Sequence, residues 1–377
     1  MKKRTKIILS IIAGIVAVGT IGGVIAVKKM KNTIKEAPNK VAQYIEDNKG
    51  KSPVSFVLKR NGEVLASINA DKKMPLASMS KWTVAIEYAK QVGKGILNPN
   101  EQVSLDTLDK YYMPNTDGGA HPDWISSIEE KGLIKDNKVS LREVARGMIM
   151  FSSNANTDYL MNYLGIENIN KTIKEMGLTN HSDVYPISAA VSLADYIKLQ
   201  ENLSDKEIKE KILKMSDEEY VANIMKIHEL MNENKLPKQM KKLPVALNNV
   251  EIQKIWSDRF ISATANDYIR MMELINSRTY FDEKTQAELN KVVEFLMETP
   301  GVDEKVNHLG MKGGSTNWIL TDARYVEDKE GNKIEIVVMF NDLDEDNHKM
   351  IMENYDLFMT FAMVDENIRK NILGILK

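Results

Sequence analysis

One serine in this chain has a lysine three residues after it. Ser78 lies in the stretch Ala77-Ser78-Met79-Ser80-Lys81, which follows Pro75 and precedes an amphipathic run over residues 82–92. A proline just before such a run is a signal of a helix start, and residues at i and i+3 share one face of a helix. The stretch therefore predicts a helix whose first turn brings the hydroxyl of Ser78 and the amine of Lys81 together, beside the free N–H groups of the helix N-terminus.

A hydroxyl, an amine and backbone N–H donors are the groups that acyl transfer through a covalent intermediate needs. Ser78 is then the candidate nucleophile, and Lys81 is the candidate base that takes its proton. A capping serine followed by a solvated lysine has the same spacing, so this motif by itself leaves a catalytic and a structural interpretation open.

The composition excludes several other kinds of chemistry. There is no cysteine, which excludes disulfides, thiolate metal sites and a lipidated cysteine. The five histidines show no ligand spacing, so we predict neither a metal ion nor a cofactor. A net charge of −2 gives no basic field for nucleic acid, and the 43% of hydrophobic residues suffices for a sizeable core.

The N-terminus predicts a membrane segment. Basic residues dominate positions 2–6, and residues 7–27 then carry no charge. A helix over this run would span roughly 30 Å, the thickness of a bilayer core. We predict an uncleaved single-pass anchor over residues 1–30, a linker over 31–37 and an extracytoplasmic body. A cleaved signal peptide is the alternative, although the end of the run offers no good cleavage site.

Strand-like segments lie at both ends of the body, with helical segments between them. Residues 54–68 predict a hairpin around Asn61-Gly62, a strong signal of a two-residue turn. Alternating segments recur within 308–340, and a terminal helix is expected over 348–376. We predict an α/β (α+β) fold whose five-stranded antiparallel sheet comes from residues 38–77 and 300–377 and is flanked by helices. Residues 78–299 form a helical subdomain in this prediction.

The middle of the chain contains one unusual polar run. Residues 140–164 have helical spacing, but six small residues, 152–157, of which five are polar, interrupt the apolar pattern. Such a run suits a polar turn that faces a cleft. Residues 106–138 are expected to be a loop that either walls a cleft or lies on the surface. Residues 192–240 are expected to be helical and mostly solvated.

Three motifs therefore stand in order along the chain. Ser78 with Lys81 comes first, Ser152-Ser153-Asn154 second, and Lys312-Gly313-Gly314 followed by Ser315 third. This set resembles the serine penicillin-recognising enzymes, in particular the class A β-lactamases and the related D-alanyl-D-alanine peptidases. The resemblance covers roughly residues 38–377 and implies the β-lactamase/transpeptidase fold for that part of the chain.

The resemblance implies a role for each residue. Ser78 would form the acyl-enzyme, and Lys81 would accept its proton, which requires a neutral amine favoured by burial and by the nearby cation of Lys312. Ser152 would pass a proton to the leaving group, and Asn154 would bind the substrate amide. Backbone N–H groups of Ser78 and Ser315, beside Gly314, would form the oxyanion hole.

The sequence departs from the family pattern in three places. Gly313 stands where the family has a hydroxyl that helps to bind the substrate carboxylate, unless Ser315 or the residue after it replaces that hydroxyl. The stretch 181–188 should supply the glutamate that activates the deacylating water, but it offers Tyr185-Pro186 and one acid, Asp183. Residues 201–262 hold more helix than a compact member of the family needs.

Three functions remain open on the sequence alone. The first is a membrane-anchored hydrolase or acyltransferase that acts on a D-alanyl-type acyl substrate of the cell wall, either a peptide or an ester. The second is a true β-lactamase, and the third is a non-catalytic penicillin-binding module. A single spanning segment with so few residues before it argues against a sensor, which appends such a domain to a larger membrane part.

Overall fold

The computed structural model describes residues 36–51, 53–242 and 249–377. Their contacts divide them into two compact units. The first unit holds the described residues up to Met79 together with Ala263–Tyr280 and Glu294–Lys377. The second holds Ser80–Ser262 and Phe281–Val293. The chain thus leaves the first unit after Met79 and returns to it twice.

The predicted membrane anchor, residues 1–30, lies outside the described residues, as does most of the predicted linker. Among the residues that are described, no helix has both the length and the apolar character needed to cross a bilayer. The anchor therefore stays a prediction from the sequence.

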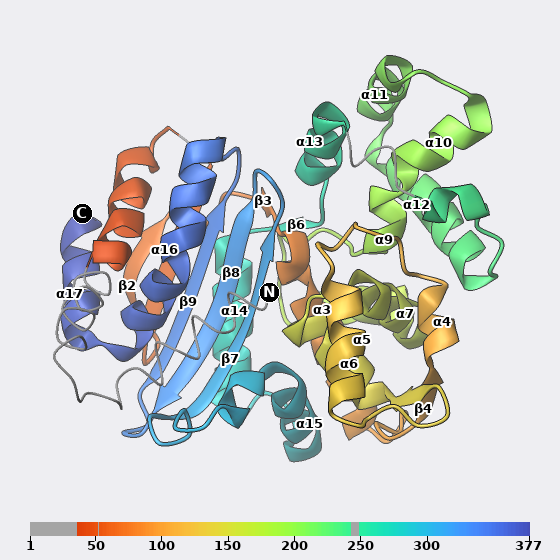
Figure 1. Cartoon of the computed structure of the whole chain (residues 1–377). Helices are drawn as coiled ribbons and strands as arrows, with labels where there is room; N and C mark the ends of the chain where they lie inside the picture. Colours follow the sequence, from red (N-terminus) through yellow and green to blue (C-terminus); the bar gives the residue numbers. More distant parts are fainter. Residues whose placement is uncertain (1–35, 52, 243–248) are drawn as a thin grey trace, which may run out of the picture. The chain divides into compact units, whose positions relative to one another are not determined.

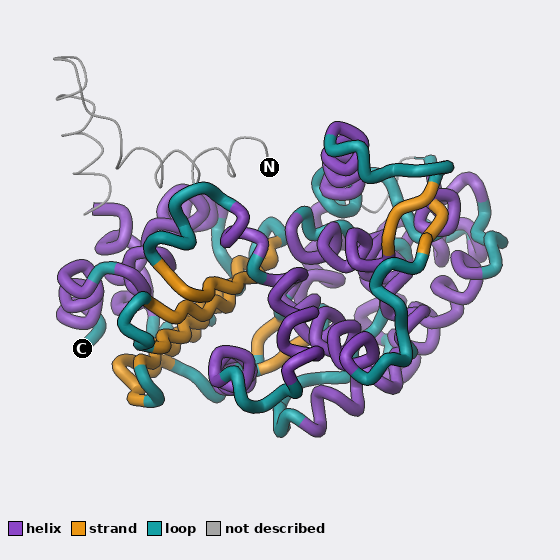
Figure 2. The backbone as a smooth tube through the Cα atoms, turned by 90° about the horizontal axis from the view of Figure 1, so that it is seen from below, coloured by secondary structure: helices purple, strands orange, loops and turns teal. Residues whose placement is uncertain are grey.

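The first unit is built on a five-stranded antiparallel sheet, as predicted. Its strands follow the order β2-β1-β9-β8-β7, so strands from the two ends of the chain pair in its centre (Figure 1). Figure 2 shows the strands of this sheet side by side. The bounds are β1 (Val54–Arg60), β2 (Glu63–Ile68), β7 (Val306–Ser315), β8 (Leu320–Asp328) and β9 (Lys333–Phe340). Because β7 is an edge strand, one side of its backbone is not paired within this sheet.

The sequence explains the strands. β8 and β9 are buried along nearly their whole length, as expected of interior strands covered on both faces, whereas β2 at the edge is largely exposed. Asn61 and Gly62 both have positive φ, 51° and 81°, as the two-residue turn between β1 and β2 requires.

Helices cover both faces of this sheet (Figure 1). One face packs against the helix over residues 36–48, α16 (Glu345–Val364) and α17 (Glu366–Ile375), with the Phe56 and Phe358 rings 5.5 Å apart. The other packs against α14 (Ala265–Ser277). There, Lys59 lies 2.9 Å from Glu273 and the Asn276 amide donates to Glu335 at 2.6 Å.

Two helices, α16 and α17, stand where the sequence predicted one terminal helix over 348–376. Asp365 separates α16 from α17, and its carboxylate accepts from the backbone N–H groups of Asn367 and Ile368 at 2.9 Å. Aspartate is a preferred N-cap because it satisfies such orphan donors. This cap explains why the helix breaks at Asp365. The apolar periodicity continues on either side of the break, so the sequence predicted one helix.

The second unit is helical around α3 (Lys81–Gly93), of which most residues are buried. The close approach of α15 requires glycine at position 93, where a Cβ atom would lie 2.1 Å from Thr285 Oγ1. The other helices are α4 (Leu105–Asp109), α5 (Ala120–Glu130), α6 (Leu141–Met150), α7 (Asn154–Leu164), α8 (Ile166–Glu175), α9 (Ile187–Val191), α10 (Leu193–Glu201), α11 (Asp205–Lys214), α12 (Asp217–Asn232), α13 (Val250–Asp258) and α15 (Glu283–Val293).

Several shorter elements lie between the main helices and strands. β4 (Gln102–Ser104) pairs with β5 (Lys138–Ser140) inside the helical unit. Short strands and 3-10 turns occur elsewhere: β3 (Met74–Pro75), β6 (Ser262–Ala263), η1 (Ala77–Ser80), η2 (Lys238–Lys241) and η4 (Phe295–Glu298).

The prediction of a loop over residues 106–138 is wrong in part, because the segment contains α4 and α5. Gly118 and Gly119 both have positive φ and form the turn that leads into α5. Trp124 is buried on α5. The glycines and prolines that suggested an irregular loop therefore mark only its first half.

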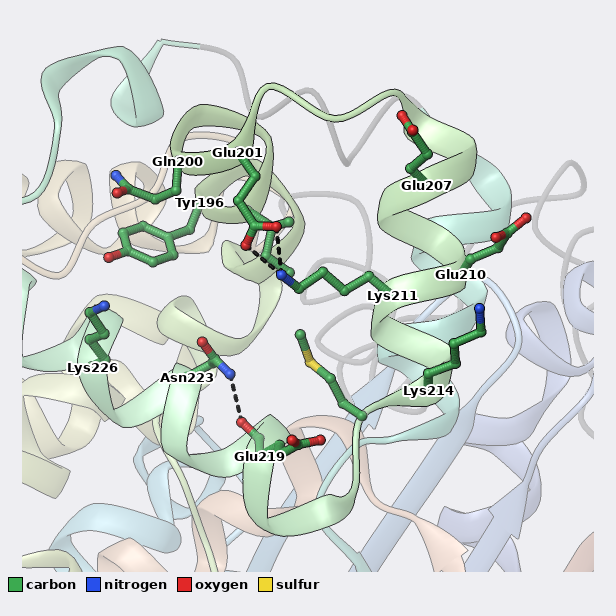
Figure 3. Close-up of a pocket in the computed structure, with 12 residues that line it drawn as sticks. Tyr196, Gln200, Glu201, Glu207, Glu210, Lys211, Lys214, Glu219, Asn223 and Lys226 are labelled. Atoms are coloured by element: carbon green, nitrogen blue, oxygen red, sulfur yellow. Dashed lines mark hydrogen bonds and ion pairs between the residues drawn. The ribbon is translucent and has the colours of Figure 1, made fainter.

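The extra helical segment forms a pocket of its own. α10, α11 and α12 surround a cavity of about 680 Å³ lined by charged side chains, among them the ion pair of Lys211 with Glu201 (Figure 3). α11 and α12 begin with capping boxes at Ser204 and Ser216. None of the predicted site residues lines this cavity.

Candidate active site

Ser78 lies in η1, the 3-10 turn that leads directly into α3. It is partly exposed, whereas its neighbours on both sides are buried. Ala77 has φ of 46°, a left-handed conformation that costs a non-glycine residue roughly 1–2 kcal/mol. Thr321 Oγ1 donates to the Leu76 carbonyl at 2.6 Å, and Met79 N–H donates to the same oxygen at 3.1 Å. These hydrogen bonds therefore fix Ser78 on a strained turn.

The edge strand β7 contacts this turn within the first unit. A Cβ atom on Gly314 would lie 2.3 Å from the Ser78 nitrogen and 2.7 Å from the Met79 nitrogen. Only glycine fits so close to backbone atoms. Gly314 therefore allows the β7 backbone to reach Ser78, and Ser315 follows as the exposed last residue of the strand.

Lys312 lies two residues earlier on β7. Its side chain is buried, and burial lowers the pKa of Lys312 to about 8, against the opposing effect of Asp322. An amine with this pKa exchanges its proton near neutral pH far more readily than an exposed lysine does.

Lys81 opens α3 and is fully buried. Its Nζ atom lies 2.7 Å from the Ser152 carbonyl, 3.2 Å from Ser152 Oγ and 2.8 Å from Asn154 Oδ1. The structure thus joins the first and second sequence motifs through one amine. Ser78 lies three residues before Lys81 and belongs to the first unit, whereas Lys81 belongs to the second.

The predicted polar run forms the end of the turn between α6 and α7 and the first turn of α7. Ser152 has φ of 68°, again left-handed for a non-glycine residue. Ser153 caps α7 by accepting from the Asn156 N–H at 3.2 Å, and its hydroxyl lies 2.9 Å from His121 Nδ1. These bonds hold Ser152 and Asn154 on either side of the cap, so both can reach the amine of Lys81.

A comparison with known families identifies the chain. A family model described as "Beta-lactamase enzyme family" matches residues 28–353. The chain belongs to the beta-lactamase enzyme family. It is accordingly a serine hydrolase related to the serine penicillin-recognising enzymes, as the three motifs suggested.

Solved structures support the same fold. A class A beta-lactamase from Bacteroides cellulosilyticus is 16% identical, with a TM-score of 0.51, over 88% of this chain and 99% of that one. A beta-lactamase from Sphaerobacter thermophilus is 13% identical, with a TM-score of 0.54, over 87% and 96%. One from Chitinophaga pinensis is 15% identical, with a TM-score of 0.50, over 87% and 99%. At these identities the likeness concerns the fold.

One buried acid of this beta-lactamase family member is not predicted by the sequence. Asp158 lies on α7, one turn after Asn154, and is fully buried. Its two oxygens accept from the Ile187 N–H at 2.7 Å and the Ser188 N–H at 2.8 Å. Burial raises the pKa of Asp158 to about 7, although these backbone donors and the charge of Lys81 oppose the rise. The i, i+4 spacing from Asn154 was the signal that could have found it.

The segment expected to carry a water-activating base has no acid in a buried position. Asp183 is exposed. Tyr185 is buried and its hydroxyl donates to the Arg259 carbonyl at 2.5 Å, while burial raises the pKa of Tyr185 well above its ordinary value. Tyr185 is therefore fixed as a neutral donor, and Asp158 has both oxygens bonded to backbone N–H groups.

We predict that Asp158 makes stability depend on pH. Because its pKa in the folded protein lies above that of an exposed aspartate, its protonation favours the folded state. This contribution is full below about pH 4 and is lost as the pH rises through about 7. Urea unfolding of the wild type and of Asp158→Asn should therefore give a stability difference that changes between these values. Parallel pH profiles for the two proteins would contradict the assignment.

Asp158→Ala tests the hydrogen bonds rather than the proton. This change leaves two buried N–H groups without their acceptor, and each unpaired donor costs about 1–3 kcal/mol. The free energy of unfolding should fall by about 2–5 kcal/mol when both proteins are compared below about pH 4, where the contribution of the Asp158 proton is full.

Proposed function

We propose that this protein is a membrane-anchored serine hydrolase or acyltransferase that acts through an acyl-enzyme on Ser78. The acyl donor is a D-alanyl-type peptide or ester of the cell wall, and the catalytic body lies outside the cytoplasm. A β-lactam would react at the same serine as a substitute for this donor.

The observation that carries the proposal is the surroundings of the Lys81 amine. A fully buried lysine whose Nζ is bonded to Ser152 and Asn154 is not a solvated surface residue, which was the structural alternative for this motif. We assign Lys81 as the base toward Ser78 and Ser152 as the group that passes the proton to the leaving group. Asn154 binds the substrate amide in this proposal.

The β7 residues supply the rest of the proposed machinery. The tight approach of the Gly314 backbone to the Ser78 nitrogen supports an oxyanion hole made by the N–H groups of Ser78 and Ser315. Lys312, which is buried and has a lowered pKa, provides positive charge for the proton transfer through Ser152.

The test is the mass of the intact protein after exposure to penicillin G. The full-length chain in detergent should gain the mass of one penicillin, and Ser78→Ala should gain none. If the adduct forms equally in both proteins, or if neither protein gains mass from penicillin G or from its methyl ester, the proposal fails. Rapid repeated ring opening would instead favour the alternative, a true β-lactamase, which the family match supports.

The membrane anchor gives a separate prediction, based on the uncharged run over residues 7–27. The full-length protein should sediment with membranes, and protease added outside intact cells should digest its body. A mature N-terminus near Lys28, found on protein in the medium, would show that the run is a cleaved signal peptide instead.

A further inference from the structure

The backbone of β7 at Gly313 faces a carboxylate. Gly313 pairs with Asp322 on β8, so a side chain at either position projects from the same face of the sheet. A Cβ atom on Gly313 would lie 3.0 Å from Asp322 Oδ2 and 3.0 Å from the Thr321 carbonyl. A serine or threonine at 313 would therefore be crowded against two oxygens. This explains why the third motif of this chain carries glycine at its middle position.

Asp322 cannot turn away from this place, because its carboxylate is held at both oxygens. Arg324 donates from Nε to Oδ1 at 3.0 Å and from Nη2 to Oδ2 at 2.7 Å. Both side chains are buried. Burial raises the pKa of Asp322 and Arg324 opposes the rise. The two-pronged contact with a guanidinium, which is always charged, favours the ionised form of this carboxylate.

The positive charge of Arg324 is paired with two carboxylates. The same Nη2 atom that binds Asp322 also donates to Asp356 on α16 at 2.6 Å. One guanidinium and two carboxylates sum to −1. Lys312, the adjacent residue on β7, offsets this charge and is itself close enough to Asp322 for their charges to interact. With Lys312 protonated, the charges of these four side chains therefore sum to zero.

We infer that Asp322 makes the enzyme discriminate against substrates that carry a free carboxylate beside Gly313, and that its natural acyl donor is uncharged there, as an ester or amide is. The inference rests on the proposed function, in which the acyl group on Ser78 places the remainder of the substrate along β7. A substrate carboxylate at this position would face Asp322 directly, because Gly313 has no side chain to separate the two carboxylates. Like charges brought together in a partly desolvated site repel each other, and the repulsion is stronger than in water.

The test compares two probes that differ only in this charge, penicillin G and its methyl ester. The rate at which each acylates the full-length protein in detergent is read from the intact mass. The wild type should react with the ester at least as fast as with the acid. Asp322→Asn keeps the shape of the side chain without its charge, and it should raise the rate with the acid on the order of 10-fold relative to the ester.

Asp356→Asn is the matched control. It also removes a carboxylate from Arg324, but on α16 rather than opposite Gly313, so the ratio of acid to ester should stay within about 2-fold of the wild type. A wild type that reacts 10-fold faster with the acid would overturn the inference while leaving the acyl-enzyme intact. An absence of adduct with either probe would overturn the proposed function, and the inference with it. If Asp322→Asn does not fold, the wild-type ratio alone decides.

Discussion

Penicillin that has acylated Ser78 should stay attached for minutes or longer. Acylation needs the nucleophile, its base and the oxyanion donors, all of which the proposal assigns. Deacylation also needs an activated water, and general-base help is typically worth about 10²–10⁴-fold. In the segment that should provide this base, Asp183 is exposed and Tyr185 is held as a donor to the Arg259 carbonyl.

The measurement mixes the enzyme with excess penicillin and follows ring opening and protein mass together. A stoichiometric burst and a persistent adduct are expected, and Asp183→Asn should leave the lifetime of the adduct unchanged. Rapid turnover without a trapped adduct would show that a base exists elsewhere. Asp158, which interacts electrostatically with Lys81, would then be the first residue to examine.

Lys81→Arg should reduce the rate of acylation by about 10²–10⁴-fold, the usual contribution of a general base. Arginine keeps the charge, but its guanidinium cannot serve as a neutral amine at ordinary pH. Because the Lys81 site is fully buried, Lys81→Met provides a second variant of similar length without the amine, and it should be impaired to the same degree. The rate comes from the same mass measurement at a single subsaturating concentration of penicillin.

Lys90→Arg is the control on the same helix. Lys90 lies in the last turn of α3 and pairs with Glu175 at 2.7 Å, so the substitution keeps an ion pair and should leave acylation unchanged. If Lys81→Arg were acylated at the wild-type rate, Lys81 would not be the base, and its bonds to Ser152 and Asn154 would be structural.

The pH dependence of acylation adds a check on Lys312. Burial holds its pKa at about 8, so its positive charge is lost as the pH rises through that value. If this charge assists the proton transfer, acylation should slow above about pH 8. Lys312→Arg, which stays charged, should move this decline to higher pH. An unchanged pH profile in the arginine variant would remove Lys312 from the proposed mechanism.

The sequence alone determined the strands, the turn and the order of the motifs. Asn61-Gly62 accepts positive φ at both positions, so the hairpin could be predicted from two residues. Alternating apolar residues predicted the late strands because one-residue alternation is the spacing that a sheet imposes. The serine and lysine of the first motif could be paired because i, i+3 spacing is local to one turn.

Only the tertiary structure could decide contacts between residues far apart in the chain. The bonds of Lys81 to Ser152 and Asn154 join α3 to the turn before α7, and those of Asp158 join α7 to α9. The sequence likewise shows Gly313 as a missing hydroxyl, but only the register of β7 against β8 places Asp322 opposite it. Strand register and helix packing depend on the complete set of apolar faces, which local spacing does not contain.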